Sequence, residues 1–185
     1  MDVQIGENEK LNQIIVYHGS VSLFDRIEVK KGKPYKDFGK GFYVTKNRSH
    51  AANLAQRNKL IEIKRGRRDI QAYLYTFELD ETGAKDFKLK EFRDASLEWL
   101  QFVISNRRVR ERTHDYDIVM GPTANDDTMS VINAYLDELF GDIGSMSALE
   151  TLLKRIKPDV LPYQVYFACD EATELLTQRG EVEIL

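Results

Sequence analysis

Alternation of apolar and polar positions predicts several short strands along the chain. Residues 70–79 give the clearest pattern, because Tyr73, Tyr75, Phe77 and Leu79 share one parity in a run rich in aromatic and branched side chains. Four more strands are expected from shorter apolar runs, at 13–18, 42–45, 116–120 and 164–169. The chain ends in VEIL, which predicts one further extended segment.

Apolar residues at helical spacing predict helices between these strands. One helix is expected to begin at Asn47 or Ser49, whose side-chain oxygens can cap a first turn, and to end near Lys59. Another begins at Asp94 or Ser96 and continues to about residue 108. Further helical segments are expected from a cap at Asp127 or Thr128, at about 145–156, and as a turn through 172–176. Residues 61–70 are predicted to form a turn around Gly66 between two extended stretches.

These elements follow one another without a regular β-α-β rhythm and without an internal repeat. The order predicts an α+β fold in one domain over residues 1–185, with the helices near 125–157 forming a lobe on the sheet. A chain of 185 residues can bury a sizeable hydrophobic core without the support of disulfide bridges or bound metal ions. One cysteine and three scattered histidines favour neither a disulfide nor a metal site. A polar N-terminus and the lack of a long apolar run predict a cytoplasmic protein without a membrane segment.

Charge is distributed unevenly along the chain. The net charge is only −3, yet residues 30–68 hold thirteen lysines and arginines against Asp37 and Glu62. Such a segment attracts anions to one face. It is equally typical of a solvated basic surface balanced by acidic neighbours. The charge alone does not distinguish a phosphate-bearing ligand from a nucleic acid.

Three short segments carry candidate chemistry. YHGS at 17–20 ends a predicted strand, where an imidazole can bond a sugar hydroxyl or a phosphate and a glycine permits close approach of a backbone. DFGKGFYVT at 37–45 places two glycines around a lysine before an aromatic pair, and QVYF at 164–167 begins a strand with a polar group. Taken singly, these segments are also typical of ordinary turns and strand edges.

In this order the three segments resemble the diphtheria-toxin and poly(ADP-ribose) polymerase-like branch of the ADP-ribosyltransferase superfamily, with its His, Tyr and Glu triad. His18-Gly19-Ser20 matches the H-G-[ST] element, and Gly39 to Tyr43 matches the glycine-rich element that ends in tyrosine. The chain is also similar to the bacterial DUF3990 family. D-F-G-x-G-F-Y, W-x-x-F-V-x-x-N-R, D-Y-D-I-V-x-G-P and Q-V-x-F carry that likeness over about residues 14–178.

This resemblance implies a split antiparallel β-sheet with flanking helices, and NAD as the substrate. The implied catalytic residues are His18, which would hold the adenosine ribose, Tyr43, which would form a wall for the nicotinamide ring, and Gln164. The residues expected to contact NAD are Gly19, Ser20, Asp37, Phe38, Gly39, Lys40, Gly41 and Arg107. No metal is implied.

The chain departs from the branch at its third catalytic position. Gln164 stands where the family has Glu, and an amide cannot accept a proton or stabilise positive charge as a carboxylate does. Asp37 is the first candidate for a replacement carboxylate, because it adjoins the glycine loop. Asp126, Asp127 and Glu171 are the others. Leu54 and Ala51 stand where the polymerases carry a stacking aromatic residue and a serine.

The expected function is that of a mono-ADP-ribosyltransferase-like enzyme that cleaves NAD and transfers ADP-ribose to a protein or nucleic-acid acceptor. The alternatives are a catalytically inactive NAD- or ADP-ribose-binding module, an RNA 2′-phosphotransferase-like enzyme, and an interaction domain without a ligand. A toxin-like role with a neutralising, antitoxin-type protein as partner stays open.

Overall fold

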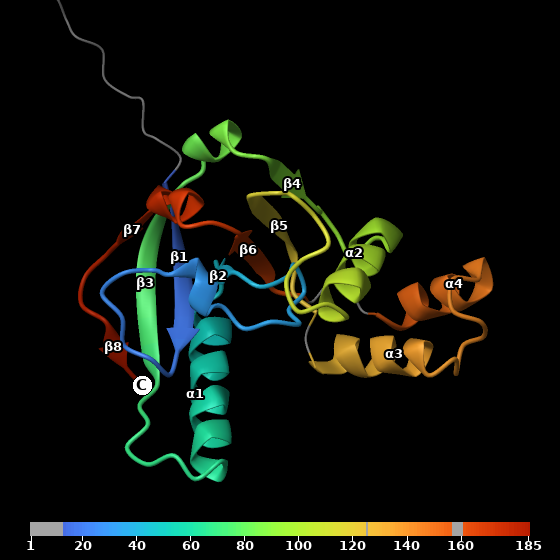
Figure 1. The fold of residues 1–185 in the computed structure, drawn as a ribbon, viewed down its shortest axis with the longest axis horizontal. Coiled ribbons are helices and arrows are strands. Elements are labelled where there is room, and N and C mark those ends of the chain that lie inside the picture. The colour runs from blue at the N-terminus through green and yellow to red at the C-terminus, as the bar shows by residue number, and fades with distance from the viewer. Residues whose placement is uncertain (1–12, 125, 157–160) are drawn as a thin grey trace, which may run out of the picture.

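The computed structural model describes residues 13–124, 126–156 and 161–185. Eight strands in these ranges form one curled sheet in the order β4-β5-β6-β2-β1-β3-β7, with β8 paired to β3 (Figure 1). All pairings are antiparallel except β4 with β5. The strands are β1 Gln13–Ser20, β2 Phe42–Thr45, β3 Tyr73–Asp80, β4 Leu89–Glu91, β5 Ile118–Pro122, β6 Tyr163–Phe167, β7 Leu176–Gln178 and β8 Glu183–Ile184.

Four α-helices in the described residues accompany the sheet. They are α1 Arg48–Lys64, α2 Leu97–Arg107, α3 Asp126–Leu136 and α4 Met146–Arg155. Figure 1 shows α1 beside β1 and β2, which lie in the middle of the sheet, and α3 and α4 together in a lobe at the right, next to α2. The predicted caps at Asn47 and Ser96 are confirmed, because their side-chain oxygens accept from the backbone N–H of His50 and Trp99. The fold is mixed α+β, as the sequence predicts.

Helix α1 continues past the predicted end at Lys59, so the extended conformation expected for residues 61–64 is wrong. The helix ends at Lys64 with Arg65 as its cap, and Gly66 follows with φ +85°. Its N–H donates to the carbonyl of Ile63, and the N–H of Arg67 donates to that of Glu62, both across the last turn. This is the pattern of a glycine-terminated helix, in which two otherwise unpaired carbonyls find donors. Gly66 therefore terminates a helix and does not connect two strands.

Three further predictions differ from the structure. Helix α3 begins at Asp126, so Asp127 and Thr128 lie within its first turn and are not its cap. The helical turn expected through residue 176 ends at Leu175 as a 3-10 helix, and β7 begins directly after it. The pattern gives no signal for β4, because three residues at a sheet edge are too few to alternate.

Hydrophobic side chains form two clusters on the two faces of the sheet. Alternation along β6 shows this, because Tyr166 belongs to the first cluster while Val165 and Phe167 belong to the second. The first cluster also contains Trp99 of α2 and extends without a break into α3 and α4, so the helical lobe shares this core. The second cluster includes the predicted buried parity of β3. In the described part of the chain, no helix has the length and apolar character needed to cross a bilayer.

Candidate functional site

The three segments singled out in the sequence meet on three neighbouring strands. Strand β2 lies between β1 and β6, so His18, Tyr43 and Gln164 come from adjacent positions in the sheet. Strand β1 pairs with β3 over eight residues but with β2 only at Tyr17 and Thr45. Beyond Tyr17, no described residue of β2 is in register with this edge of β1, and α1 packs against Gly19 there. We call the place where the two strands separate the β1–β2 seam.

His18 spans the seam with its side chain. Its Nδ1 lies 2.7 Å from the carbonyl oxygen of Tyr43, and its ring stacks on Phe42 with centroids 4.3 Å apart. Burial lowers the pKa of His18 to about 4, so the ring is neutral near pH 7. A carbonyl only accepts, so the proton sits on Nδ1, and Nε2 is left as a hydrogen-bond acceptor. No described residue donates to Nε2.

Tyr43 points to the opposite face of the sheet. Its ring packs in the first cluster, 5.1 Å from the ring of Tyr166, whereas His18 packs against members of the second. The Tyr43 hydroxyl donates to the carbonyl of Gly39 at 2.6 Å and accepts from the N–H of Phe38 at 3.1 Å. Burial, with a further contribution from Asp37, raises the pKa of Tyr43 well above its usual value. The phenol therefore stays neutral near pH 7 and is fixed in place by its two hydrogen bonds.

The glycine loop is shaped by close backbone contacts. Gly39 has φ +99°, a conformation that strains other residues. The N–H of Lys40 donates to the carbonyl of Glu111 at 2.9 Å, which joins the loop to the segment after α2. A Cβ on Gly41 would lie 2.1 Å from the ring of Tyr166. These contacts fix the backbone that leads into Tyr43.

Asp37, Arg107 and Gln164 form one buried polar network. Arg107 donates from Nε to Oδ1 of Asp37 at 2.6 Å, and the two side chains form an ion pair; its Nη2 donates to the carbonyl of Ala124 at 3.4 Å. Oδ2 of Asp37 accepts from the N–H of Ala124 at 3.0 Å and from Nε2 of Gln164 at 2.8 Å. Nε2 of Gln164 also lies 3.4 Å from the carbonyl oxygen of Pro122. The structure thus brings together three residues that the sequence singled out separately.

Several residues expected to contact NAD have other partners. Phe38 is completely buried in the first cluster, so its ring is a core side chain. Lys40 directs its ammonium group toward Glu111, at 3.5 Å. The side of Gly19 where a Cβ would stand faces α1, 2.0 Å from the carbonyl oxygen of Ala51. Ser20 Oγ accepts from the N–H of Ser22.

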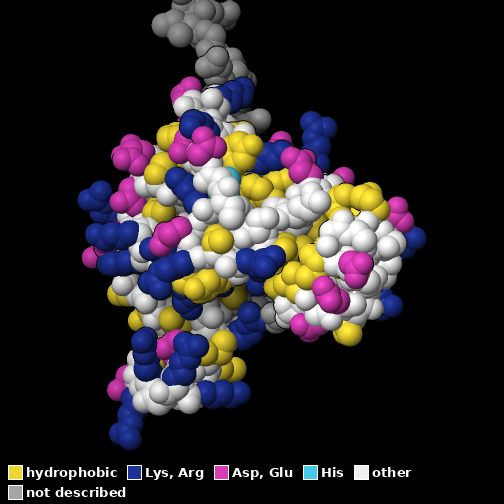
Figure 2. All heavy atoms as spheres, turned by 45° about the vertical axis from the view of Figure 1, so that its right-hand side comes forward, with side chains coloured by type: hydrophobic (Ala, Val, Ile, Leu, Met, Phe, Trp, Pro, Cys, Tyr) yellow, Lys and Arg dark blue, Asp and Glu magenta, His cyan; other side chains and the backbone are white. Residues whose placement is uncertain are grey.

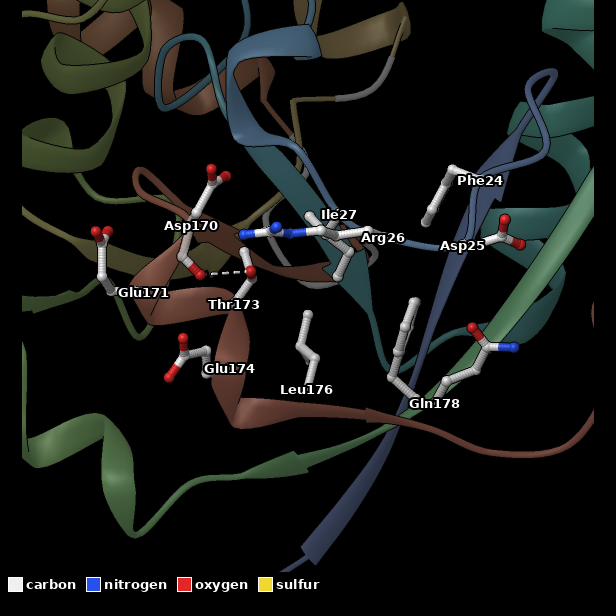
Figure 3. Close-up of a pocket in the computed structure, with 11 residues that line it drawn as sticks. Phe24, Asp25, Arg26, Ile27, Asp170, Glu171, Thr173, Glu174, Leu176 and Gln178 are labelled. Carbon is white, nitrogen blue, oxygen red and sulfur yellow. Dashed lines mark hydrogen bonds between the residues drawn. The ribbon is translucent and has the colours of Figure 1, made fainter.

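The other candidate carboxylates lie apart from this network. Asp127 is exposed on α3, and the side chain of Asp126 lies outside the described residues. Glu171 lines a cleft of about 400 Å³ between the loop after β1 and the 3-10 helix Glu171–Leu175 (Figure 3). In that cleft the side-chain Oδ1 of Asp170 accepts from the N–H of Val29, and its backbone carbonyl accepts from the Thr173 hydroxyl. No group of three potential metal ligands occurs among the described side chains.

Sequence reasoning missed Lys36 and the segment after α2. Lys36 is half-buried, and burial together with the nearby Arg107 lowers its pKa. It is one residue from Asp37, so adjacency was the available signal. The side chain of Asn106 is buried and accepts from the N–H of Thr113 at 2.9 Å, and His114 Nε2 lies 2.8 Å from the carbonyl oxygen of Phe38. These contacts place residues 108–116 against the glycine loop, an arrangement that no local pattern indicates.

Much of the basic segment is neutralised by ion pairs. Among the described residues, seven of its thirteen cations lie within 4 Å of a carboxylate, and Arg57 has an interaction as well. Figure 2 shows Lys and Arg mixed with Asp and Glu over the visible face, and Lys and Arg gathered around the lower end, where α1 ends. The paired cations are Lys30, Lys31, Lys40, Lys46, Arg48, Arg65 and Arg67.

Comparison with known proteins gives one match. No curated protein and no solved structure matches the chain. The family model described as "Protein of unknown function (DUF3990)" matches residues 14–177, which is most of the chain. The protein therefore belongs to the DUF3990 family.

Proposed function

We propose that the protein binds NAD at the β1–β2 seam, cleaves the nicotinamide–ribose bond and transfers ADP-ribose to a macromolecular acceptor. The observation that carries this proposal is a pair of oriented acceptors. Nε2 of His18 is an acceptor because Nδ1 is bonded to Tyr43, and Oε1 of Gln164 is an acceptor because Nε2 faces Asp37. Both atoms suit the hydroxyl groups of ribose.

The likeness to ADP-ribosyltransferases assigns these acceptors to the two ribose rings of NAD. His18 would hold the adenosine ribose, and Gln164 the ribose attached to nicotinamide. Tyr43 lies on the face of the sheet opposite His18, so one NAD molecule contacts both residues only by crossing the seam. In that position the neutral ring of Tyr43 offers a flat surface for the nicotinamide. The backbone of Gly19, where β1 separates from β2, would pair with the carboxamide. Lys36 is a half-buried cation close to this region and suits the pyrophosphate.

The proposed reaction needs a positioned leaving group more than a strong base. When the carbon–nitrogen bond breaks, its electron pair goes to nicotinamide, which leaves as a neutral molecule, and positive charge develops on the ribose. A nucleophile of the acceptor then bonds to the anomeric carbon and loses its proton to water. Holding the leaving ring and one ribose hydroxyl in place contributes by orientation, and the partial negative charge of Oε1 stabilises the developing cation.

A second candidate is an NAD-binding module without turnover. The observation that favours it is the amide itself, because Gln164 carries no negative charge to stabilise the ribose cation. The two candidates share the same binding contacts and differ only in nicotinamide release.

The proposal is tested by measuring nicotinamide release from NAD with the purified protein and with His18→Ala. Loss of release in this variant, and its retention in the control Glu174→Gln, supports the enzyme. Glu174 lines the cleft of Figure 3 and lies apart from the seam. Saturable NAD binding without release supports the module, and the absence of binding at millimolar NAD refutes both. Labelled NAD added to a cell lysate then identifies the acceptor as protein or nucleic acid.

A further inference from the structure

The orientation of the Gln164 side chain follows from the chemistry of its neighbours. Nε2 lies 2.8 Å from a carboxylate oxygen of Asp37 and 3.4 Å from the carbonyl oxygen of Pro122. Both neighbours only accept hydrogen bonds, so the NH₂ group must face them and Oε1 must face away. No described residue donates to Oε1, and this atom is not among their sealed, unpartnered polar atoms. Gln164 is a buried side chain, 7% exposed, and Oε1 is its polar atom that the described protein leaves without a donor.

Asp37 is fully occupied by the protein. Its side chain is only 4% exposed, and its two oxygens accept three hydrogen bonds, from Arg107, from the Ala124 N–H and from Gln164. The Arg107 contact is also an ion pair, and a hydrogen bond between charged groups is stronger than one between neutral groups. The carboxylate is therefore buried and held by protein donors. Asp37 thus acts on Gln164, and not on a substrate.

We propose that Asp37 and Arg107 are positioning residues that hold the Gln164 amide with its oxygen toward the ligand. Gln164 then accepts the hydrogen bond that a Glu accepts in the ADP-ribosyltransferase branch, but without a negative charge. This inference rests on the proposed NAD reaction for its functional meaning. A carboxylate beside the NH₂ group also polarises the amide and strengthens its oxygen as an acceptor.

The same network explains why residue 164 is an amide. A Glu at this position would bring a second carboxylate against buried Asp37, and two such groups in contact cannot both ionise. Gln164 supplies the donor that Asp37 needs and an acceptor for the ligand at once. The contact with buried Asp37 therefore accounts for Gln, rather than Glu, at position 164.

The first test uses NMR and needs no substrate. The side-chain NH₂ resonances of Gln164, assigned by their loss in Gln164→Glu, are expected to exchange slowly with solvent in the wild-type protein. In Asp37→Asn they are expected to shift and to exchange faster, because an Asn can offer a donor that reverses the amide. Unchanged resonances would overturn the proposal. If Asp37→Asn does not fold, Arg107→Lys, which keeps the charge but removes the Nε donor, is expected to give a smaller shift in the same direction. No shift would count against the proposal.

The second test uses turnover of NAD. Asp37→Asn is expected to lower kcat about tenfold, roughly the effect of one hydrogen bond, with little change in KM. Gln164→Glu is expected to acquire a dependence of kcat on pH, from the coupled carboxyl pair, which the wild type lacks. In the double variant Asp37→Asn, Gln164→Glu that dependence is expected to move to lower pH, because the remaining carboxyl no longer faces a second one and ionises more easily.

The two tests separate failure of the inference from failure of the proposed function. Equal kcat in Asp37→Asn and wild type, or a pH profile in Gln164→Glu that the second substitution leaves unchanged, would refute the positioning role. If the wild-type protein neither binds nor cleaves NAD, the proposed function fails, and the NMR result alone decides whether Asp37 orients Gln164. Glu174→Gln serves as the matched carboxylate-to-amide control, because Glu174 is exposed in the other cleft.

Discussion

At the scale of single residues, the chemistry of each candidate group is set by a neighbour that is distant in sequence. His18 becomes an acceptor at Nε2 because Tyr43, 25 residues later, supplies a carbonyl to Nδ1. Gln164 becomes an acceptor at Oε1 because Asp37, 127 residues earlier, faces its NH₂ group. The identity of these residues does not tell which of their atoms faces the ligand as an acceptor, since an imidazole and an amide can each donate or accept hydrogen bonds.

The depressed pKa of His18 makes folding stability depend on pH. The unfolded chain binds a proton near pH 6.5, whereas the folded protein resists it until about pH 4. Stability is therefore full above pH 6.5 and falls between pH 6.5 and 4, by at most about 3 kcal/mol from this residue. Urea unfolding of wild type and His18→Asn at several pH values measures the effect.

His18→Asn is the matched variant because Asn can still donate to Tyr43 and does not titrate. His50 and His114 also have pKa values lowered by burial, so they contribute with the same sign in both proteins. The difference between the two proteins isolates His18. An identical loss of stability in both proteins toward pH 4 would contradict the prediction.

The sequence singled out the members of the buried polar network, but it did not indicate that they contact one another. Asp37, Arg107 and Gln164 all appear among the expected residues, because each lies in or beside a recognisable motif. Their mutual bonds depend on the packing of β6 and α2 around the glycine loop, which no local pattern encodes. Phe38 shows the same limit, because an aromatic residue in a glycine loop looks identical whether it faces a ligand or the core.

At the scale of elements, the ends of α1 show what local sequence does and does not determine. Its start follows from a capping side chain, and the structure selects Asn47 over Ser49. Its end does not follow from propensity, because the branched residues of 61–63 favour strands when read alone. The helix continues because a glycine termination motif lies further on, at Gly66. Strand β4 is stabilised only by pairing with β5, so its existence is a tertiary property.

Asn47→Ala is expected to destabilise the protein by about 1 kcal/mol, the usual effect of removing a helix cap. The cause is loss of the bond from the His50 N–H to the Asn47 side chain, 2.8 Å long. Ser49 lies two residues after Asn47, in the first turn of α1, and is exposed. Ser49→Ala is expected to change the free energy of unfolding by less than about 0.5 kcal/mol. Urea denaturation of both variants measures the difference. Equal losses would show that Asn47 is not the effective cap.

At the scale of the whole molecule, charge pairing limits what the basic segment can do. Its cations are dispersed among carboxylates from several elements, and the protein carries a net charge of −3. We therefore expect weak binding to a random DNA duplex at physiological salt, with a Kd of about 10⁻⁴ M, at the weak end of the range for non-specific binding. Fluorescence anisotropy at increasing salt measures it. A Kd near 10⁻⁸ M, or no dependence on salt, would contradict this view of the surface.

The only tryptophan of the chain stands one hydrogen bond from the candidate site. The indole N–H of Trp99 donates to the Pro122 carbonyl at 3.0 Å, the same oxygen that faces Nε2 of Gln164. The indole is completely buried, so its emission reports a single, defined environment. The protein thus contains an intrinsic fluorescent probe. A ligand that binds to the Gln164 amide changes the electric field at Trp99. Binding to unlabelled protein is therefore detected as a shift in the wavelength or intensity of tryptophan emission.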